Sequence, residues 1–108
     1  MGMIDSSWMK IGAFLGPGMV FDTPDDEVWI TEVNGALLGI SNICTHKLGP
    51  LNEGGQRNGS VECPWHGYVF DLSSGVCTSH KCANLRRYQV AVQDGILYLK
   101  ERMRGENI

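Results

Sequence analysis

Residues 44–70 read CTHKLGPLNEGGQRNGSVECPWHGYVF, and this stretch decides what the rest of the chain has to support. Each end of it carries one cysteine and one histidine: Cys44 with His46, and Cys63 with His66. Thiolate and imidazole are both metal ligands, and two such pairs in short segments predict a metal site with four protein ligands. These four side chains are therefore the candidate functional residues.

The residues around the four candidate ligands suit loops that converge on a metal. Pro64 restricts Cys63 to an extended backbone. Gly67 lets the chain leave the second histidine without a Cβ clash. Leu48 and Trp65 are apolar, and we expect them to shield the metal from water.

The order of the ligands along the chain is Cys, His, Cys, His. Structural zinc is the ordinary interpretation of two Cys and two His in a small domain, but zinc fingers usually pair like with like. The alternating order suits two loops that each give a thiolate to one iron and an imidazole to a second iron. Because imidazole is neutral, the second iron becomes the easier one to reduce. The sequence favours a two-iron cluster and leaves structural zinc open.

Across the rest of the chain, the turn residues and the alternating or β-branched segments predict a small antiparallel all-β domain. Asn34-Gly35 and Asp94-Gly95 are tight-turn dipeptides, and each joins two β-branched or alternating segments into a hairpin. Residues 52–60 predict an exposed loop, because Gly and Asn dominate them. Residues 76–86 predict an irregular loop that runs back past the metal site, and no helix is predicted. The expected strands are 8–11, 19–21, 27–33, 36–40, 60–62, 68–72, 88–93 and 96–99.

Length and composition predict one domain, residues 1–108, with frayed ends over 1–7 and 101–108. A net charge of −3 argues against a nucleic-acid partner. The chain has no apolar run long enough to span a bilayer and no pattern of a signal peptide. We therefore expect a cytoplasmic protein without a membrane partner, where Cys and His clusters indicate metal or catalysis more often than disulfides.

The spacing of Cys44, His46, Cys63 and His66, with Pro and Trp before the last histidine and Gly after it, resembles the Rieske [2Fe-2S] signature. The resemblance extends over residues 8–100. It implies a small antiparallel sandwich or barrel with the cluster-binding loops at one tip and one cluster per chain. It also implies that the two cysteines bind the buried iron and the two histidines bind the iron nearer the surface.

Some positions near the four candidate ligands differ from those of other Rieske proteins, and these differences indicate which members of the family the chain resembles. High-potential Rieske proteins of the bc-type complexes carry a disulfide between the loops, where this chain has Gly49 and Trp65. They also carry a Ser and a Tyr that donate to the cluster sulfurs, where this chain has Tyr68 and Phe70. Fewer donors stabilise the reduced cluster less, so we expect a potential nearer about −150 mV than about +300 mV. Soluble Rieske ferredoxins of ring-hydroxylating oxygenases are similar in this respect.

Three further side chains need an interpretation. With His46 and His66 assigned to the cluster, only His80 remains, so the chain lacks the two His that a mononuclear oxygenase iron would need. We expect His80 to be a solvated surface residue. Cys77 and Cys82 are interpreted as free thiols in a loop, with a disulfide or a second metal pair as the alternatives.

Together these features predict a one-electron carrier and not an enzyme. The resemblance implies that it takes electrons from a flavin-dependent, NAD(P)H-oxidising reductase. The resemblance also implies that the carrier passes these electrons to a terminal dioxygenase, as in the catabolism of aromatic hydrocarbons. Two alternatives stay open: a Rieske small subunit inside a larger oxidoreductase, such as a nitrite-reductase-like complex, and a zinc-stabilised binding module. The sequence does not identify the oxygenase, its substrate or the reductase.

Overall fold

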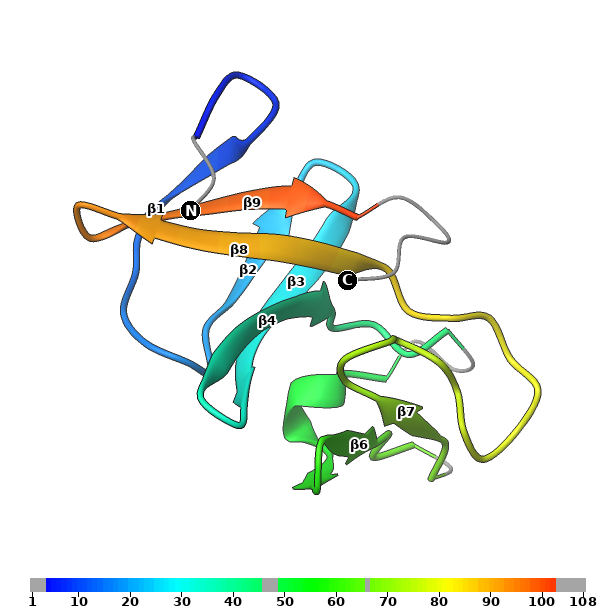
Figure 1. Cartoon of the computed structure of the whole chain (residues 1–108). Coiled ribbons are helices and arrows are strands. Elements are labelled where there is room, and N and C mark those ends of the chain that lie inside the picture. Colours follow the sequence, from blue (N-terminus) through cyan, green and yellow to red (C-terminus); the bar gives the residue numbers. More distant parts are fainter. Residues whose placement is uncertain (1–3, 46–48, 66, 103–108) are drawn as a thin grey trace.

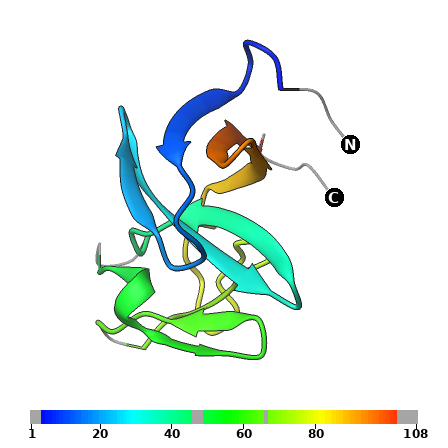
Figure 2. The ribbon, with the colours of Figure 1, turned by 90° about the vertical axis from the view of Figure 1, so that its left-hand side faces the viewer.

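The computed structural model describes residues 4–45, 49–65 and 67–102, and within them it is built from antiparallel strands. Six strands form a large sheet in the order β1-β9-β8-β4-β3-β2, and three form a small sheet in the order β5-β6-β7. Figures 1 and 2 show the small sheet lying beneath the large one, so the predicted all-β fold is confirmed. The strands are β1 (Met9–Ala13), β2 (Val20–Thr23), β3 (Asp26–Val33), β4 (Ala36–Ser41), β5 (Gly55–Arg57), β6 (Ser60–Glu62), β7 (Val69–Asp71), β8 (Arg87–Gln93) and β9 (Ile96–Glu101).

Both predicted hairpins are present. Asn34 and Gly35 join β3 to β4 with φ of 52° and 82°, and Asp94 and Gly95 join β8 to β9 with φ of 54° and 75°. Positive φ at both central positions is the geometry of the two-residue turn that matches the twist of paired strands.

The predicted loop over residues 52–60 is mostly exposed, as expected, but the prediction is wrong in that the segment contains regular structure. Leu51–Glu53 forms one turn of 3-10 helix, where no helix was expected, and β5 then pairs with β6. Asn58 and Gly59, with φ of 51° and 79°, make the same kind of turn as the other two hairpins. Strand β5 is exposed along its whole length, so its polar sequence lacks the alternation that identifies half-buried strands.

The expectation of a frayed C-terminal end is wrong at Glu101. Strand β9 continues through this residue, which pairs with Tyr88. Its carboxylate also lies 2.7 Å from the Arg86 guanidinium. At the other end, residues 4–8 form a turn in which Asp5 accepts hydrogen bonds from Ser7. The expectation for residues 1–3 and 103–108 falls outside the described residues.

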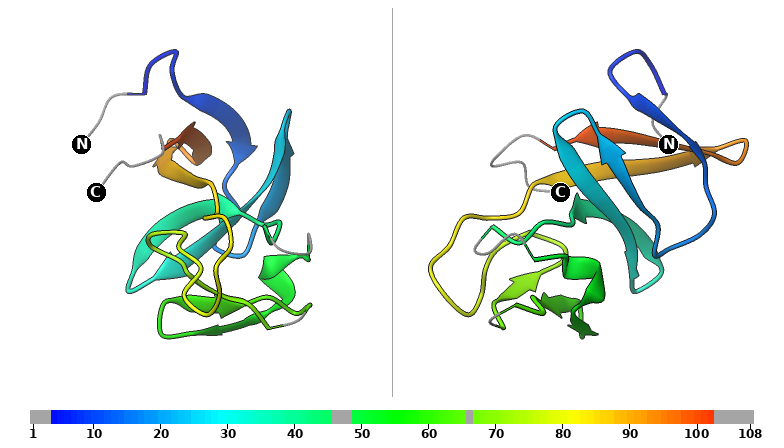
Figure 3. Two further views of the ribbon diagram at one scale, coloured as in Figure 1. Left: turned by 90° about the vertical axis from the view of Figure 1, so that its right-hand side faces the viewer. Right: turned by 180° about the vertical axis from the view of Figure 1, so that it is seen from behind.

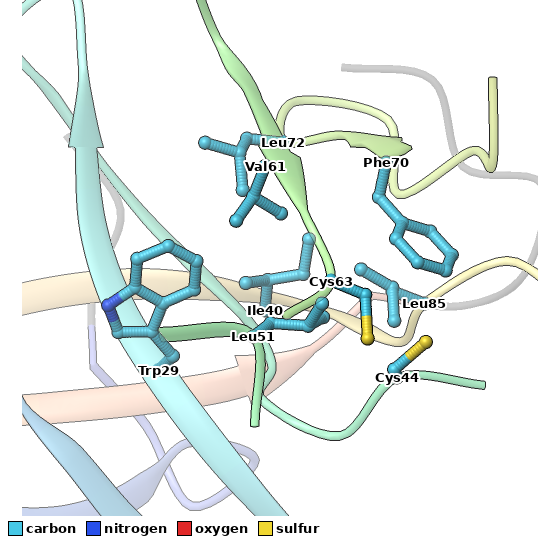
Figure 4. Packing of buried hydrophobic residues seen from close by; sticks show 9 residues of the cluster. All are labelled: Trp29, Ile40, Cys44, Leu51, Val61, Cys63, Phe70, Leu72 and Leu85. Carbon is cyan, nitrogen blue, oxygen red and sulfur yellow. The ribbon is translucent and has the colours of Figure 1, made fainter. Parts of the chain in front are cut away.

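Two groups of buried side chains form the core. One lies on the large sheet and includes Val28, Ile30 and Leu97. The other lies where the small sheet meets the large one, and it contains the two cysteines of the candidate metal site (Figure 4). The two cysteines of the candidate metal site are therefore part of the hydrophobic core between the two sheets. No helix in the described residues has the length and apolar character needed to cross a membrane.

A buried carboxylate ties the first strand of the β3–β4 hairpin to β8. The side chain of Asp26 is 6% exposed and accepts hydrogen bonds from the Tyr88 hydroxyl, the Ser41 hydroxyl and the Glu27 amide. Burial and the adjacent Asp26 carboxylate raise the pKa of Tyr88, which keeps its hydroxyl protonated as the donor.

We expect Tyr88→Phe to lower the free energy of unfolding by about 1–3 kcal/mol, because a buried carboxylate then loses a donor. Urea unfolding followed by circular dichroism measures this. Tyr98→Phe is the matched control, since the Tyr98 hydroxyl has no hydrogen bond with the described residues, and its effect should stay within about 0.5 kcal/mol. Equal losses in the two variants would contradict the role of the Asp26 contact.

Candidate metal centre

Two thiols meet in the core where the loops after β4 and β6 begin. Cys44 is 0% and Cys63 1% exposed. Figure 4 shows their sulfur atoms beside each other, next to Phe70 and Leu85. Burial raises the pKa of the Cys63 thiol, and the neighbouring Cys44 adds to this effect. Such a pair is poorly stable as two thiolates unless a metal neutralises the charge.

The first loop is held by a buried asparagine that the sequence analysis did not single out. Asn42 is 1% exposed, and its amide donates to Glu27 Oε2 and Asn52 Oδ1 at 2.8 Å each. Its side-chain oxygen accepts from the Asn52 backbone at 2.7 Å. Cys44 N then donates to Gly49 O at 2.9 Å, which closes the loop. The partners of Asn42 come from two other segments, β3 and the 3-10 turn, and no local pattern signals them.

The second loop closes in the way its glycine predicts. Cys63 N donates to Tyr68 O at 2.7 Å, and Gly67 N donates to Cys63 O at 3.2 Å. Gly67 has φ of 73°, the left-handed conformation that permits this tight return.

The two loops touch at Gly49 and Trp65. A Cβ atom on Gly49 would lie 3.0 Å from both Cys63 Sγ and Trp65 Cγ, so a larger residue here would crowd the thiol and the tryptophan ring. Trp65 is 51% exposed and covers this side of the thiols only in part. Leu48, the other predicted shield, lies outside the described residues.

The segment 76–86 covers the same end of the molecule, as predicted (Figure 3). Thr45 Oγ1 donates to Ala83 O at 2.7 Å, which ties this segment to the first loop. His80 is exposed, as expected, but it is not simply solvated: its ring stacks on Tyr68 with centroids 3.9 Å apart and planes at 8°. The predicted surface histidine therefore packs against the second loop.

Cys77 and Cys82 are free thiols, as favoured, and they interact with each other. Burial raises the pKa of Cys77, but hydrogen bonds with Cys82, the His80 and Ser79 amides and the Ser79 hydroxyl outweigh it and lower the pKa overall. Burial and the adjacent Cys77 raise the pKa of Cys82 to about 11, although its hydrogen bond with Thr45 opposes this.

Of the four predicted ligands, the structure brings Cys44 and Cys63 together. His46 and His66 lie outside the described residues, and the described part of the chain has no group of three or more metal-ligating side chains. Two buried thiols at the junction of two loops fit the thiolate half of an iron–sulfur site. The fold and the thiols thus indicate a small β iron–sulfur protein.

The comparisons with known proteins agree. The model of the Rieske [2Fe-2S] domain matches residues 15–89. The ferredoxin component of the p-cumate 2,3-dioxygenase system of Pseudomonas putida is 35% identical over 69 residues, which cover 62% of this chain and 58% of that protein. The cytochrome b6-f complex iron-sulfur subunit of Chlorobaculum tepidum is 30% identical over 80 residues, which cover 74% of this chain and 44% of that protein.

A solved structure of a ferredoxin also matches this chain, and the match extends over nearly the whole of that ferredoxin. The ferredoxin of carbazole 1,9a-dioxygenase from Nocardioides aromaticivorans IC177 superposes with a TM-score of 0.72 at 27% identity. The match covers 87% of this chain and 99% of that ferredoxin. The chain belongs to the Rieske [2Fe-2S] domain family, and the predicted [2Fe-2S] cofactor is confirmed. These comparisons give no support to structural zinc, the alternative that the sequence left open.

Proposed function

We propose that this protein is a one-electron carrier that delivers electrons to a terminal oxygenase of the ring-hydroxylating class and performs no catalysis itself. The observation that carries the proposal is the match, with a TM-score of 0.72, over 99% of the ferredoxin of a carbazole dioxygenase. The donor would be a flavin-dependent, NAD(P)H-oxidising reductase. We propose that this electron transfer takes place in the cytoplasm. We also propose that residues 1–108 form one Rieske domain.

We propose that Cys44 and Cys63 ligate one iron and that His46 and His66 ligate the other. The cluster supplies reversible one-electron transfer when bound. The protein supplies the rest: Asn42 holds the first loop, and the segment 76–86 limits the access of water. In such an arrangement the imidazole edges form the outer end of the site, where a partner would dock.

The buried surroundings of the thiols support a low potential. Phe70 is 0% exposed, packs in the same core group as Cys44 and Cys63, and carries no hydroxyl. Without a hydroxyl donor from position 70 the reduced cluster is less stabilised, so we expect a potential nearer about −150 mV than about +300 mV. Spectroelectrochemical titration measures it.

Phe70→Tyr should raise this potential by roughly 40 mV. The added hydroxyl can donate toward the sulfurs, and a hydrogen bond worth about 1 kcal/mol corresponds to that shift for one electron. Phe21→Tyr is the control, because Phe21 packs on the other core group and should leave the potential unchanged. A lower or equal potential in Phe70→Tyr would contradict the argument from missing donors.

The carrier role is tested by mixing the chemically reduced protein with an oxidised Rieske oxygenase of the ring-hydroxylating class. We expect stopped-flow spectra to show reoxidation of the carrier at a rate that saturates with oxygenase concentration. Both proteins should separate again on gel filtration. Permanent co-purification with a large subunit would instead indicate a component of a bigger oxidoreductase. No reoxidation by any Rieske oxygenase, despite an intact cluster, would reject the proposal.

A further inference from the structure

The large sheet opens between β4 and β8. The ladder between these two strands contains only two residue pairs, Gly39 with Tyr88 and Ile40 with Arg87. Beyond Gly39, β4 stays paired with β3 and β8 stays paired with β9, so the two hairpins separate toward their turns (Figures 1 and 3). A Cβ atom on Gly39 would lie 3.1 Å from Val90 Cγ2, so the strands are in close contact here and part from this point on.

A cavity of about 720 Å³ lies at this opening. It is lined by residues 88–93 of β8 together with Ile4, Trp8, Leu37 and Arg102. Leu37 and Val90 pack against the core group that does not contain Cys44 and Cys63. A partner bound at the opening would therefore leave the cluster end of the molecule free.

The backbone of β8 directs hydrogen-bonding groups toward the opening. In an antiparallel strand, successive residues direct their N–H and C=O groups to opposite sides. Arg86 O accepts from Ser41 N at the end of β4, whereas Arg87 O accepts from the residue that follows β9. By this alternation Val90 and Val92 direct their backbone groups toward β4, beyond the last residue pair of the ladder. Such a strand edge can pair with an extended peptide.

The opening combines apolar walls with a buried positive group. Trp8, Leu37 and Val92 supply apolar surface, and no acidic side chain is among the described residues that line the cavity. Arg102 lines it as well, and its Nη1 atom is buried without a hydrogen-bond partner in the described part of the chain. Because an unpaired charged donor in a buried place is costly, the site favours a ligand that carries a carboxylate.

We propose that this opening binds an extended segment of a partner protein as an additional strand on the free edge of β8. Side chains of that segment that point inward, as Val90 does, should be apolar, because they reach the core group of the large sheet. Glu101 pairs with the buried Tyr88, so the next residue, Arg102, lies on the outer face. An outward-pointing side chain of the segment should therefore carry the carboxylate that contacts Arg102.

The carboxylate contact is tested with the cluster-containing protein and a fluorescent peptide, Val-Glu-Val-Glu-Val, with blocked ends. We expect fluorescence anisotropy to show saturable binding, and Val-Gln-Val-Gln-Val should bind about tenfold more weakly, because it lacks the charged acceptor. Arg102→Gln should weaken binding of the acidic peptide about tenfold and remove the preference between the two peptides. Arg57→Gln is the matched control, since it removes an exposed cation from β5, and the affinity should stay unchanged.

The strand pairing is tested at Val92. Val92→Pro removes a backbone N–H that faces the opening and not β9, so it should weaken peptide binding at least about tenfold. Val92→Thr keeps the N–H and should bind within about twofold of wild type. Hydrogen exchange followed by NMR tests the wild-type protein without any substitution. The peptide should slow exchange of the Val90 and Val92 amides about tenfold and leave Gln89 and Ala91, which pair with β9, nearly unchanged.

The other outcomes overturn the proposal. Absence of saturable binding, or equal affinity for the acidic and neutral peptides, would reject the site. Binding with unchanged exchange of the Val90 and Val92 amides would reject the strand pairing. Binding that needs deletion of residues 103–108 would assign the opening to the end of the chain itself, and a dimer that the peptide dissociates would assign it to a second copy. These readouts do not depend on any oxygenase, so they stand apart from the carrier role.

Discussion

Cys63→Ser should yield a nearly colourless protein with less than about 1% of the wild-type metal affinity. The Cys63 thiol is 1% exposed and lies beside the Cys44 thiol, so its replacement removes half of the thiolate pair. Serine offers an alkoxide that is much harder to form at neutral pH and is a harder ligand than iron in a sulfide cluster prefers. Loss of outer-shell partners alone costs 10–100-fold in metal affinity, so loss of a ligand should cost more than about 100-fold.

The experiment compares iron and sulfide content and visible absorption in four variants purified side by side. Cys44→Ser should behave like Cys63→Ser. Cys77→Ser and Cys82→Ser are the matched controls, because both alter a partly buried cysteine of the same core group, and they should keep the full cluster. A red-brown Cys63→Ser protein with a full complement of iron would reject Cys63 as a ligand.

Removal of the cluster should also weaken the fold at one end. The thiols belong to the core group that joins the small sheet to β3 and β4, so ligation and packing stabilise the same residues. Metal binding free energy then contributes to folding free energy. Residues of the other core group, such as Leu97 on β9, lie on the large sheet away from the thiols and should be less affected.

Much of the fold could be predicted from the sequence where the signal is local. Asn34-Gly35 and Asp94-Gly95 mark their turns because few residues other than Gly, Asn and Asp adopt positive φ. Strand β8 is recognisable by alternation. Strand β5 was missed, since its exposed polar residues carry no pattern, although Asn58 follows the same turn chemistry.

The candidate site also has features that the sequence could predict and features that it could not. That Cys44 and Cys63 come together could be predicted, because a metal imposes ligand types and spacing, whereas the role of these two cysteines and of His46 and His66 as ligands stays a prediction. The contacts that hold the loops could not be predicted. The Thr45 to Ala83 hydrogen bond joins residues 38 positions apart, and the stacking of His80 on Tyr68 depends on where a patternless loop returns. Such contacts depend on the tertiary structure.

A glycine between the 3-10 turn and β5 should be the most sensitive backbone position near the site. A Cβ atom on Gly54 would lie 1.8 Å from Glu62 O and 3.0 Å from Glu62 C. Backbone cannot turn aside as a flexible side chain does, so Gly54→Ala must push β6 away from the 3-10 turn. We expect the free energy of unfolding to fall by about 3 kcal/mol.

A shift of the Glu62 backbone should also move Cys63, because the two residues are adjacent in the chain. The displacement should therefore disturb the cluster. We expect Gly54→Ala to lose iron faster than wild type as well as to unfold at lower urea. Gly55→Ala is a control one residue away: its added Cβ meets nothing within 4 Å, and its effect should stay within about 0.5 kcal/mol. Equal stability of the two variants would show that β6 tolerates the shift. A destabilised Gly54→Ala protein with normal iron retention would instead separate the packing of the small sheet from the hold on Cys63.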